Sequence, residues 1–241
     1  MQPKKTNTSF IYLTALILLL AVAVVLFLRS SLFTIREVKV AGLSNISLAE
    51  VERLTAGIKG QNIIMFDQDD FRKKALLNPL VQSVSFQRIL PATVVVEYKE
   101  RSPVALVVVP RGIIEVDQDG VFLRRHETWP KTSSPVITGI NVPDTAGPGQ
   151  KLNISGLTAG LKLLSQAPPQ LLPILGEVNV NPIEQMTLFL NNGVEVRLGK
   201  TDNWNAKLLA LLQLINDASY KSIQKSVRYI DFTAAKPVIG R

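Results

Sequence analysis

Two short acidic clusters are the first residues in the sequence that could support chemistry. Asp67, Asp69 and Asp70 form D-Q-D-D, which suggests a metal-binding loop. This cluster lacks the glycine and the distant glutamate of an EF-hand. Acidic residues are favoured at the start of a helix, so we interpret the cluster as a helix start. Asp117 and Asp119 suggest paired catalytic carboxylates, but D-Q-D-G between two apolar strands is typical of a turn. Neither cluster therefore predicts a metal site or a catalytic site.

The absence of cysteine and the scarcity of histidine exclude several kinds of catalytic and zinc-binding site. The chain has no cysteine and a single histidine, His126, so thiol catalysis, disulfides and Cys/His zinc sites are excluded. A serine hydrolase that used His126 would need a nucleophile motif, and neither G-x-S-x-G nor S-x-x-K occurs in a setting that supports one. We interpret His126 as a surface histidine beside Arg124 and Arg125. The sequence predicts no catalytic residue, no metal ligand and no cofactor.

The strongest candidate for a functional site is a binding strand late in the sequence. Residues 227–232 alternate in polarity, and we expect them to form a sheet edge whose unpaired backbone groups accept a partner strand. The candidate partner-binding residues are Arg228, Tyr229, Ile230 and Asp231. Arginine and tyrosine are frequent anchors at protein interfaces. The alternative is that Tyr229 is a strand residue that faces the core.

The composition indicates a folded protein with a positive net charge, and its lysine and arginine residues are not concentrated in one segment. Of the 241 residues, 46% are hydrophobic and 19% are charged, which excludes a wholly disordered chain and allows one or two packed domains. The formal net charge is +8. The basic excess is small and evenly spread beyond the apolar N-terminal segment, and the longest basic cluster is only residues 72–74. Nucleic-acid-binding proteins gather lysine and arginine on one face or run, so we predict no nucleic-acid partner.

The uncharged run at residues 10–28 predicts a membrane anchor in the lipid bilayer. Its length corresponds to about 28 Å of helix, enough to cross the hydrocarbon core. A cleaved signal peptide is the alternative, because Lys4 and Lys5 precede the run. However, the run is longer than the apolar part of a signal peptide and no A-x-A site follows it. The orientation is not decided by charge counting, since Arg29, Arg36 and Lys39 follow closely.

The segment after the anchor has the pattern of a small α+β domain. Ser47 and Glu50 form a capping box that begins a helix, and Asn78-Pro79 ends a second helix. Val96 is expected to face inward. The expected order is β-α-α-β-β, with strands at 36–41, 81–88 and 93–100 and helices at 47–56 and 67–77.

The remainder of the chain is expected to be mostly β with flanking helices. Turn residues separate short apolar runs, as in the Asn191-Asn192-Gly193 hairpin. A helical period follows Trp204. Strands are expected at 105–109, 113–117, 121–125, 186–190 and 194–198, a helix at 158–166, and a final strand at 227–232.

The order and spacing of several segments resemble the FtsQ/DivIB family of bacterial cell-division proteins. The first is F-T-I-R-E-V-K-V-A-G at 33–42, with which the family begins its POTRA domain. The others are N-P-L-V-Q-S-V-S-F-Q-R-I-L-P at 78–91, V-E-Y-K-E-R-S-P-V-A at 96–105, I-I-E-V-D-Q-D-G at 113–120, V-E-V-R-L-G-K at 194–200 and V-R-Y-I-D-F at 227–232.

The resemblance implies a domain organisation. A short cytoplasmic tail (1–9) would precede a transmembrane helix (10–28), a POTRA domain (33–101) and a β domain with a C-terminal partner-binding strand (102–241). The N-terminus would lie inside the cytoplasmic membrane and the body outside it.

The resemblance also implies a function. Family members are non-enzymatic divisome scaffolds at the septum that bind FtsL and FtsB/DivIC and help control septal peptidoglycan synthesis. In the family, the arginine and tyrosine that match Arg228 and Tyr229 belong to the surface that receives FtsB/DivIC.

Two other functions remain open from the residues. One is a membrane-anchored extracytoplasmic enzyme that acts on the cell wall, which would need a clustered acid/base pair in a cleft. The other is a POTRA-type transport or assembly chaperone, which would bind many extended peptides instead of one partner.

Overall fold

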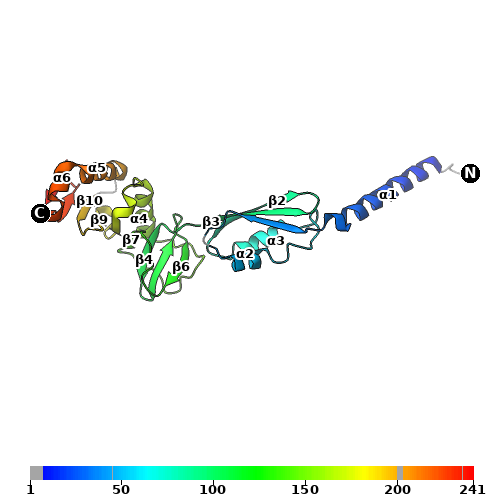
Figure 1. The fold of residues 1–241 in the computed structure, drawn as a ribbon, viewed down its shortest axis with the longest axis horizontal. Helices are drawn as coiled ribbons and strands as arrows, with labels where there is room; N and C mark the ends of the chain where they lie inside the picture. Colours follow the sequence, from blue (N-terminus) through cyan, green and yellow to red (C-terminus); the bar gives the residue numbers. More distant parts are fainter. Residues whose placement is uncertain (1–7, 45, 200–202, 235) are drawn as a thin grey trace, which may run out of the picture. The chain divides into compact units, whose positions relative to one another are not determined.

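The computed structural model describes residues 8–44, 46–199, 203–234 and 236–241 (Figure 1). The chain forms two compact units. The first reaches to Leu77 and also includes Val81–Glu100. The second comprises Asn78–Leu80 and Arg101–Arg241.

Helix α1 (Thr8–Leu28) is the expected membrane anchor, and it begins two residues earlier than the sequence predicted. Its side chains from Ser9 to Phe27 are exposed, and the mean hydropathy of the segment is 3.0. So large an exposed apolar surface is stable in lipid and not in water. Among the described residues, α1 is the helix long and apolar enough to cross a membrane. The expected tail falls mostly on residues 1–7, which lie outside the described part of the chain.

The rest of the first unit is a three-stranded sheet with two helices on one face (Figure 1). The strand order is β1-β3-β2, with β1 parallel and β2 antiparallel to the central β3. The predicted order β-α-α-β-β is confirmed. The elements are η1 (Ser31–Phe33), β1 (Glu37–Ala41), α2 (Leu48–Thr55), α3 (Gln68–Ala75), β2 (Val81–Ile89) and β3 (Thr93–Glu100).

Local signals set the helix starts in this unit. The Ser47 hydroxyl accepts a hydrogen bond from the Glu50 N–H, as the capping box predicted. The Asp67 carboxylate accepts from the N–H groups of Asp69 and Asp70. Val96 is fully buried, as expected. It lies in the core with Ile35, Ile58, Ile63 and Val94.

The second unit is built on a nine-stranded mixed sheet with the order β12-β11-β10-β9-β8-β7-β4-β5-β6. Pairs β4/β7, β7/β8 and β10/β11 are parallel, and the other neighbours are antiparallel. Its strands are β4 (Ala105–Val109), β5 (Gly112–Val116), β6 (Phe122–His126), β7 (Val136–Thr138), β8 (Leu175–Asn179), β9 (Met186–Leu190), β10 (Glu195–Gly199), β11 (Tyr229–Asp231) and β12 (Val238–Gly240). Its helices are α4 (Ser155–Gln166), η2 (Leu172–Ile174), η3 (Ile183–Gln185), α5 (Trp204–Asn216), α6 (Ala218–Ile223) and η4 (Gln224–Ser226).

Helices α4 and α5 contact each other and complete the core of this unit. Helix α4 approaches the sheet closely at Gly160, where an added Cβ would lie 3.1 Å from Ile137 and 3.3 Å from Val180. Leu157 of α4 and Leu208 of α5 are fully buried. This packing holds strands from distant parts of the sequence in one sheet.

The strongly patterned hairpins of the second unit were predicted correctly, but strands β7, β8 and β12 were not predicted. Strands β7 and β12 have only three residues each, too few to show an alternating pattern. The expected helix at 158–166 begins earlier, at Ser155. The expected final strand is shorter than predicted, and it is not the last strand, because β12 follows it.

Candidate partner-binding site

The predicted binding strand is β11, and its expected edge position is wrong. It pairs in parallel with β10 on one side and antiparallel with β12 on the other. The Arg228 N–H donates to the Gly240 carbonyl over 2.9 Å. The chain therefore folds back after β11, and β12 forms the sheet edge. A fold-back of this kind is invisible in the alternation of a single strand, because that pattern reports burial and not neighbours.

The four candidate residues do not share one environment. Ile230 is fully buried, while Arg228 is exposed and Tyr229 and Asp231 are half-buried. Within β11 itself, residues 229–231, the central side chain faces the core and its two neighbours are half-buried, as expected of a strand with one face on the core. The structure thus brings Arg228, Tyr229 and Asp231 to the surface and assigns Ile230 to the core. Tyr229, for which a core position was the alternative, is half-buried, and the fully buried residue is its neighbour Ile230.

Tyr229 is held by residues that the sequence analysis did not identify. The Arg197 guanidinium carbon lies 4.5 Å from the Tyr229 ring centre, and Arg197 Nε lies 2.7 Å from Glu195 Oε1. On β12, a Cβ added to Gly240 would lie 2.0 Å from Cε1 of the tyrosine, so the ring packs against the Gly240 backbone. The tyrosine ring is therefore held in place by residues of both neighbouring strands, β10 and β12. The V-E-V-R-L-G pattern of β10 was visible in the sequence, but its pairing with β11 was not.

The charges at this site are stabilised by local hydrogen bonds. Asp231 Oδ1 accepts from the Thr233 hydroxyl at 2.6 Å and from the Thr233 N–H at 2.7 Å. These bonds lower the pKa of the Asp231 carboxyl, and the charge of Arg197 lowers it further. The hydrogen bond to Glu195 raises the pKa of the Arg197 guanidinium. Both groups thus remain charged around neutral pH, and Asp231 begins the turn that leads to β12.

Acidification is expected to weaken this turn. Because the folded-state pKa of Asp231 is depressed, its stabilising contribution is present above the unfolded value of about 3.9 and is lost as the pH falls through the folded value. Thermal unfolding of wild type and Asp231→Ala should therefore differ at pH 6 and converge in strong acid. A difference that persists unchanged in strong acid would contradict this assignment.

The acidic clusters perform the structural roles that their patterns indicated. Asp67 caps α3, Asp69 pairs with Arg72, and Asp70 lies 2.7 Å from Lys74. Among the described residues, no group of three acidic or histidine side chains is placed to hold a metal ion.

Asp117 is a buried turn residue. Its Oδ1 accepts from the N–H groups of Asp119 (2.9 Å) and Val121 (2.8 Å), and its Oδ2 lies 2.5 Å from Arg101 Nη1. Asp119 is more exposed and lies 3.4 Å from the same Arg101 nitrogen. Both carboxylates therefore serve the turn and its ion pair.

His126, which we interpreted as a surface histidine beside Arg124 and Arg125, is only partly exposed and is paired with a carboxylate. Its side chain is 28% exposed, and Nε2 lies 3.0 Å from Oε1 of the buried Glu115. Arg124 Nε lies 3.1 Å from the other oxygen of Glu115. The carboxylate is on the neighbouring strand β5, so the sequence around His126 could not show it.

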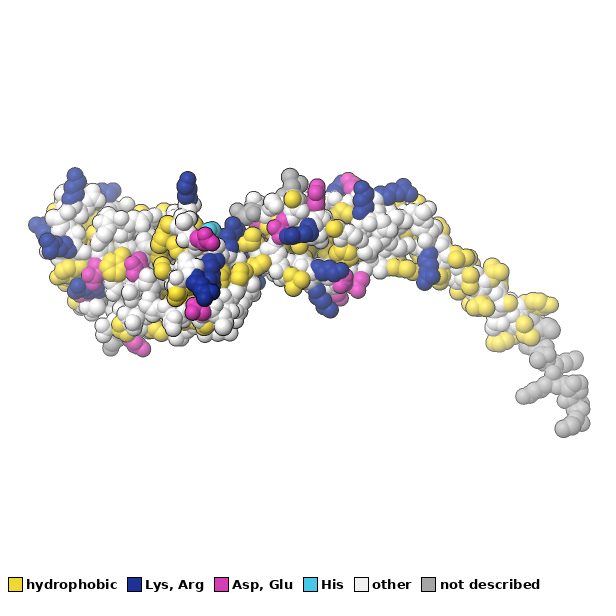
Figure 2. Space-filling model, turned by 90° about the horizontal axis from the view of Figure 1, so that it is seen from below, with side chains coloured by type: hydrophobic (Ala, Val, Ile, Leu, Met, Phe, Trp, Pro, Cys, Tyr) yellow, Lys and Arg dark blue, Asp and Glu magenta, His cyan; other side chains and the backbone are white. Residues whose placement is uncertain are grey.

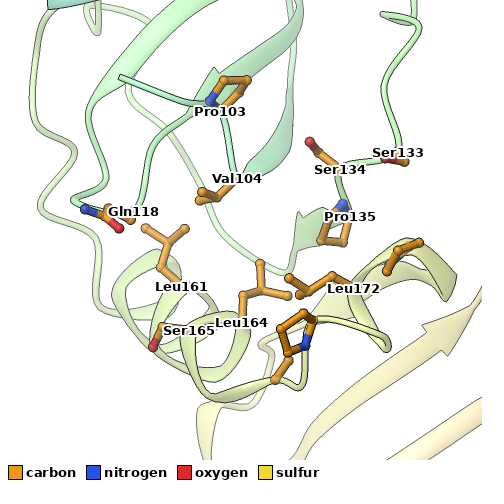
Figure 3. Close-up of a pocket in the computed structure, with 13 residues that line it drawn as sticks. Pro103, Val104, Gln118, Ser133, Ser134, Pro135, Leu161, Leu164, Ser165 and Leu172 are labelled. Carbon is orange, nitrogen blue, oxygen red and sulfur yellow. The ribbon is translucent and has the colours of Figure 1, made fainter. Parts of the chain in front are cut away.

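An apolar cavity of about 460 Å³ lies beside α4 in the second unit (Figure 3). Figure 3 shows Leu161 and Leu164 of α4 on one side of the cavity and Val104 and Pro135 on the other. Its polar lining comes from Gln118, Ser133, Ser134 and Ser165. Among the described residues that line the cavity, none has an acidic, basic or histidine side chain that could act as a general acid or base.

Sequence comparison connects both units to one family. The model described as "Cell division protein FtsQ/DivIB, C-terminal" matches residues 105–232, which is more than half of the chain. The model described as "POTRA domain, FtsQ-type" matches residues 33–101. The chain belongs to the FtsQ/DivIB family of cell division proteins. The C-terminal match includes β11 and ends before β12.

Two individual FtsQ proteins match this chain over most of their own length, at a low sequence identity. The cell division protein FtsQ of Myxococcus fulvus is 28% identical over 208 residues, covering 85% of this chain and 72% of the relative. That of Anaeromyxobacter sp. is 28% identical over 207 residues, covering 84% and 69%. A solved extracytoplasmic domain of DivIB from Geobacillus stearothermophilus matches with a TM-score of 0.34 and 17% identity, covering 54% of this chain and 98% of that domain.

This FtsQ/DivIB-family chain therefore combines an N-terminal apolar helix, a POTRA domain and a mostly β domain with helices. Family membership supports a role in cell division. Together with α1, it indicates a single-pass membrane protein of the division site.

Proposed function

We propose that this protein is a non-enzymatic, bitopic divisome scaffold at the septum. It binds FtsL-like and FtsB/DivIC-like division proteins and helps control septal peptidoglycan synthesis. Its N-terminus lies in the cytoplasm and its body outside the cytoplasmic membrane. Family membership and α1 support this proposal. The apolar lining of the cavity beside α4 gives the rival cell-wall enzyme no acid/base pair.

The observation that carries the proposal is the sheet edge at β12, with β11 beside it; we call these two strands the β11–β12 edge. In the part of the chain that the structure describes, strand β12 has a strand neighbour on one side only, and its Val238 side chain is 49% exposed. A partner segment that adds to the free side of β12 gains main-chain hydrogen bonds along the edge. Side chains must then supply specificity, and Arg228 and Tyr229 are the anchors that we assign to this role. Asp231 orders the turn, and Ile230 holds the strand to the core.

The interface predicts a measurable loss of affinity in two variants. Arg228→Ala and Tyr229→Ala should each weaken binding of the FtsB/DivIC-like partner by about thirtyfold, equivalent to about 2 kcal/mol for a hot-spot side chain. Calorimetry on residues 31–241 measures binding, and a thermal melt of the same protein reports folding.

Arg111→Ala is the matched control. Arg111 is also exposed, but it lies in the turn between β4 and β5, separated from β11 in the strand order of the sheet. Its removal should leave affinity unchanged. Wild-type affinity in both site variants would exclude the β11–β12 edge, and an unfolded Tyr229→Ala protein would assign the ring to the core. Binding of many unrelated extended peptides would favour the chaperone alternative.

The topology has its own test. A reporter enzyme that is active only outside the cytoplasm should be active when fused after residue 241 and inactive when fused before residue 1. The reason is that α1 crosses the bilayer once and is not cleaved. An active N-terminal fusion, or a mature protein that begins near Ser30, would contradict the proposed anchor.

A further inference from the structure

Four exposed apolar side chains of the first unit belong to segments next to the end of α1. Leu32 is 46% exposed, Met65 54%, Ile89 46% and Leu90 59%. We call these four residues the juxtamembrane patch. Leu32 belongs to η1, Met65 to the loop before α3, and Ile89 and Leu90 to the end of β2 and the turn that follows it. A small soluble domain usually buries such side chains or uses them for contacts, so the patch requires an explanation.

Hydrogen bonds hold all three segments against the residues that follow α1. The Asn62 side-chain amide donates to the Leu28 carbonyl at 2.8 Å, at the last residue of the helix. The Ile63 N–H donates to the Phe33 carbonyl at 2.8 Å, which ties the same loop to η1. The Arg36 N–H donates to the Ala92 carbonyl at 2.9 Å, which ties the β2–β3 turn to the start of β1. The patch thus lies at the end of the unit where α1 enters.

The position of Leu32 in the sequence limits its distance from the end of α1, and so from the bilayer. Leu32 is four residues beyond Leu28, so its Cα lies within about 14 Å of the helix end even if the chain between them were fully extended. The interfacial zone on each side of the hydrocarbon core is roughly 5–8 Å thick. With α1 ending at the bilayer surface, Leu32 lies in this zone or next to it.

The side chains around the juxtamembrane patch include positive charges, which anionic lipid headgroups attract. Arg29, Arg36 and Arg88 are exposed on the same three segments or next to them. Arg88 is fixed by a 2.9 Å hydrogen bond to the Phe66 carbonyl. The nearby carboxylate of Glu37 lies 3.7 Å from Lys39, which offsets its charge. Figure 2 shows hydrophobic and basic side chains next to one another where the helix meets this unit.

We propose that the POTRA unit docks on the lipid bilayer through the juxtamembrane patch. Leu32, Met65, Ile89 and Leu90 enter the interfacial zone, and Arg29, Arg36 and Arg88 contact anionic lipid headgroups. The proposal rests on α1 as a membrane anchor and is independent of which side of the membrane carries the body. As a consequence, the POTRA unit has a fixed orientation relative to the membrane surface and does not rotate freely about the end of α1.

The absence of cysteine makes the test direct, because one introduced cysteine carries one fluorescent label. The full chain is reconstituted in vesicles of phosphatidylcholine and phosphatidylglycerol, with the label at Leu90→Cys or Met65→Cys. Leu77→Cys is the matched control, since Leu77 is 81% exposed in the same unit but precedes the opposite end of β2. Leu20→Cys, within α1, reports insertion of the anchor.

Iodide in the water should quench the labels at positions 65 and 90 several-fold less than the label at position 77. A spin-labelled lipid should quench positions 65 and 90 and not position 77. Equal iodide quenching at 65, 77 and 90, with position 20 protected, would overturn the docking while leaving the anchor intact. An accessible position 20 would overturn both. Protection found in native membranes but not in pure lipid would assign the patch to a protein partner and also overturn the proposal.

The headgroup contact is tested separately. Combining Arg29→Gln and Arg36→Gln should raise iodide quenching at position 90 in vesicles with phosphatidylglycerol, toward the value in phosphatidylcholine alone. No change on removing these charges would overturn the role of the arginines.

Discussion

Replacing Val96 with Asp is expected to unfold the POTRA unit. Val96 is fully buried on the central strand, where its register partners are Val40 on β1 and Phe86 on β2. A carboxylate there would be buried without a partner, at a cost of several kcal/mol. That loss is comparable with the whole stability of a small domain. A thermal melt of residues 33–101 would measure it.

Val95→Asp is the matched control for this variant. Val95 is the adjacent residue on the same strand, half-buried on the opposite face, and its register partners are Lys39 and Gln87. A charge in this polar setting should change stability by less than about 1 kcal/mol. If Val96→Asp melted at the wild-type temperature, residues 33–101 would not form a core around Val96.

Asp117→Ala is expected to cause the second largest loss, about 3 kcal/mol of stability in the second unit. The substitution removes two hydrogen bonds to backbone N–H groups of the turn and the ion pair with Arg101. The Asp117 side chain is 3% exposed and that of Arg101 is 19% exposed, so the largely buried arginine would keep only its longer contact with Asp119. Chemical denaturation of residues 31–241, followed by a probe of the second unit, would measure this loss.

Two further variants separate the turn from the ion pair. Asp117→Asn keeps an oxygen that can accept from the turn N–H groups but removes the charge, so it should lose less stability than Asp117→Ala. Asp119→Ala removes only the more exposed contact and should cost less than about 1 kcal/mol. Equal stability of Asp117→Ala and wild type would show that neither interaction stabilises the fold.

The candidate site was only partly predictable, because burial and pairing are different properties. The alternation of residues 227–232 located the strand and the types of its side chains. It did not show that β12 covers the expected edge, nor that Arg197 of β10 lies over the Tyr229 ring. The β-branched pair Val238-Ile239 after Pro237 was the available signal for β12, but three residues are too short for a reliable pattern.

The sequence by itself determined the features that depend on neighbours along the chain. The uncharged run specifies the helix that can span a membrane, Ser47 and Asp67 specify helix starts, and Asn-Asn-Gly specifies a hairpin. These signals operate within a few residues, where the backbone conformation of one residue constrains the next.

Only the tertiary structure decided which distant segments meet. Three examples are the parallel pairing of β10 with β11, the contact of His126 with Glu115 and the assembly of the juxtamembrane patch. In each of them, the residue types alone would be compatible with many other neighbours. Their selection depends on the cores of the two units, where close packing and the pairing of buried backbone groups allow few arrangements of the strands.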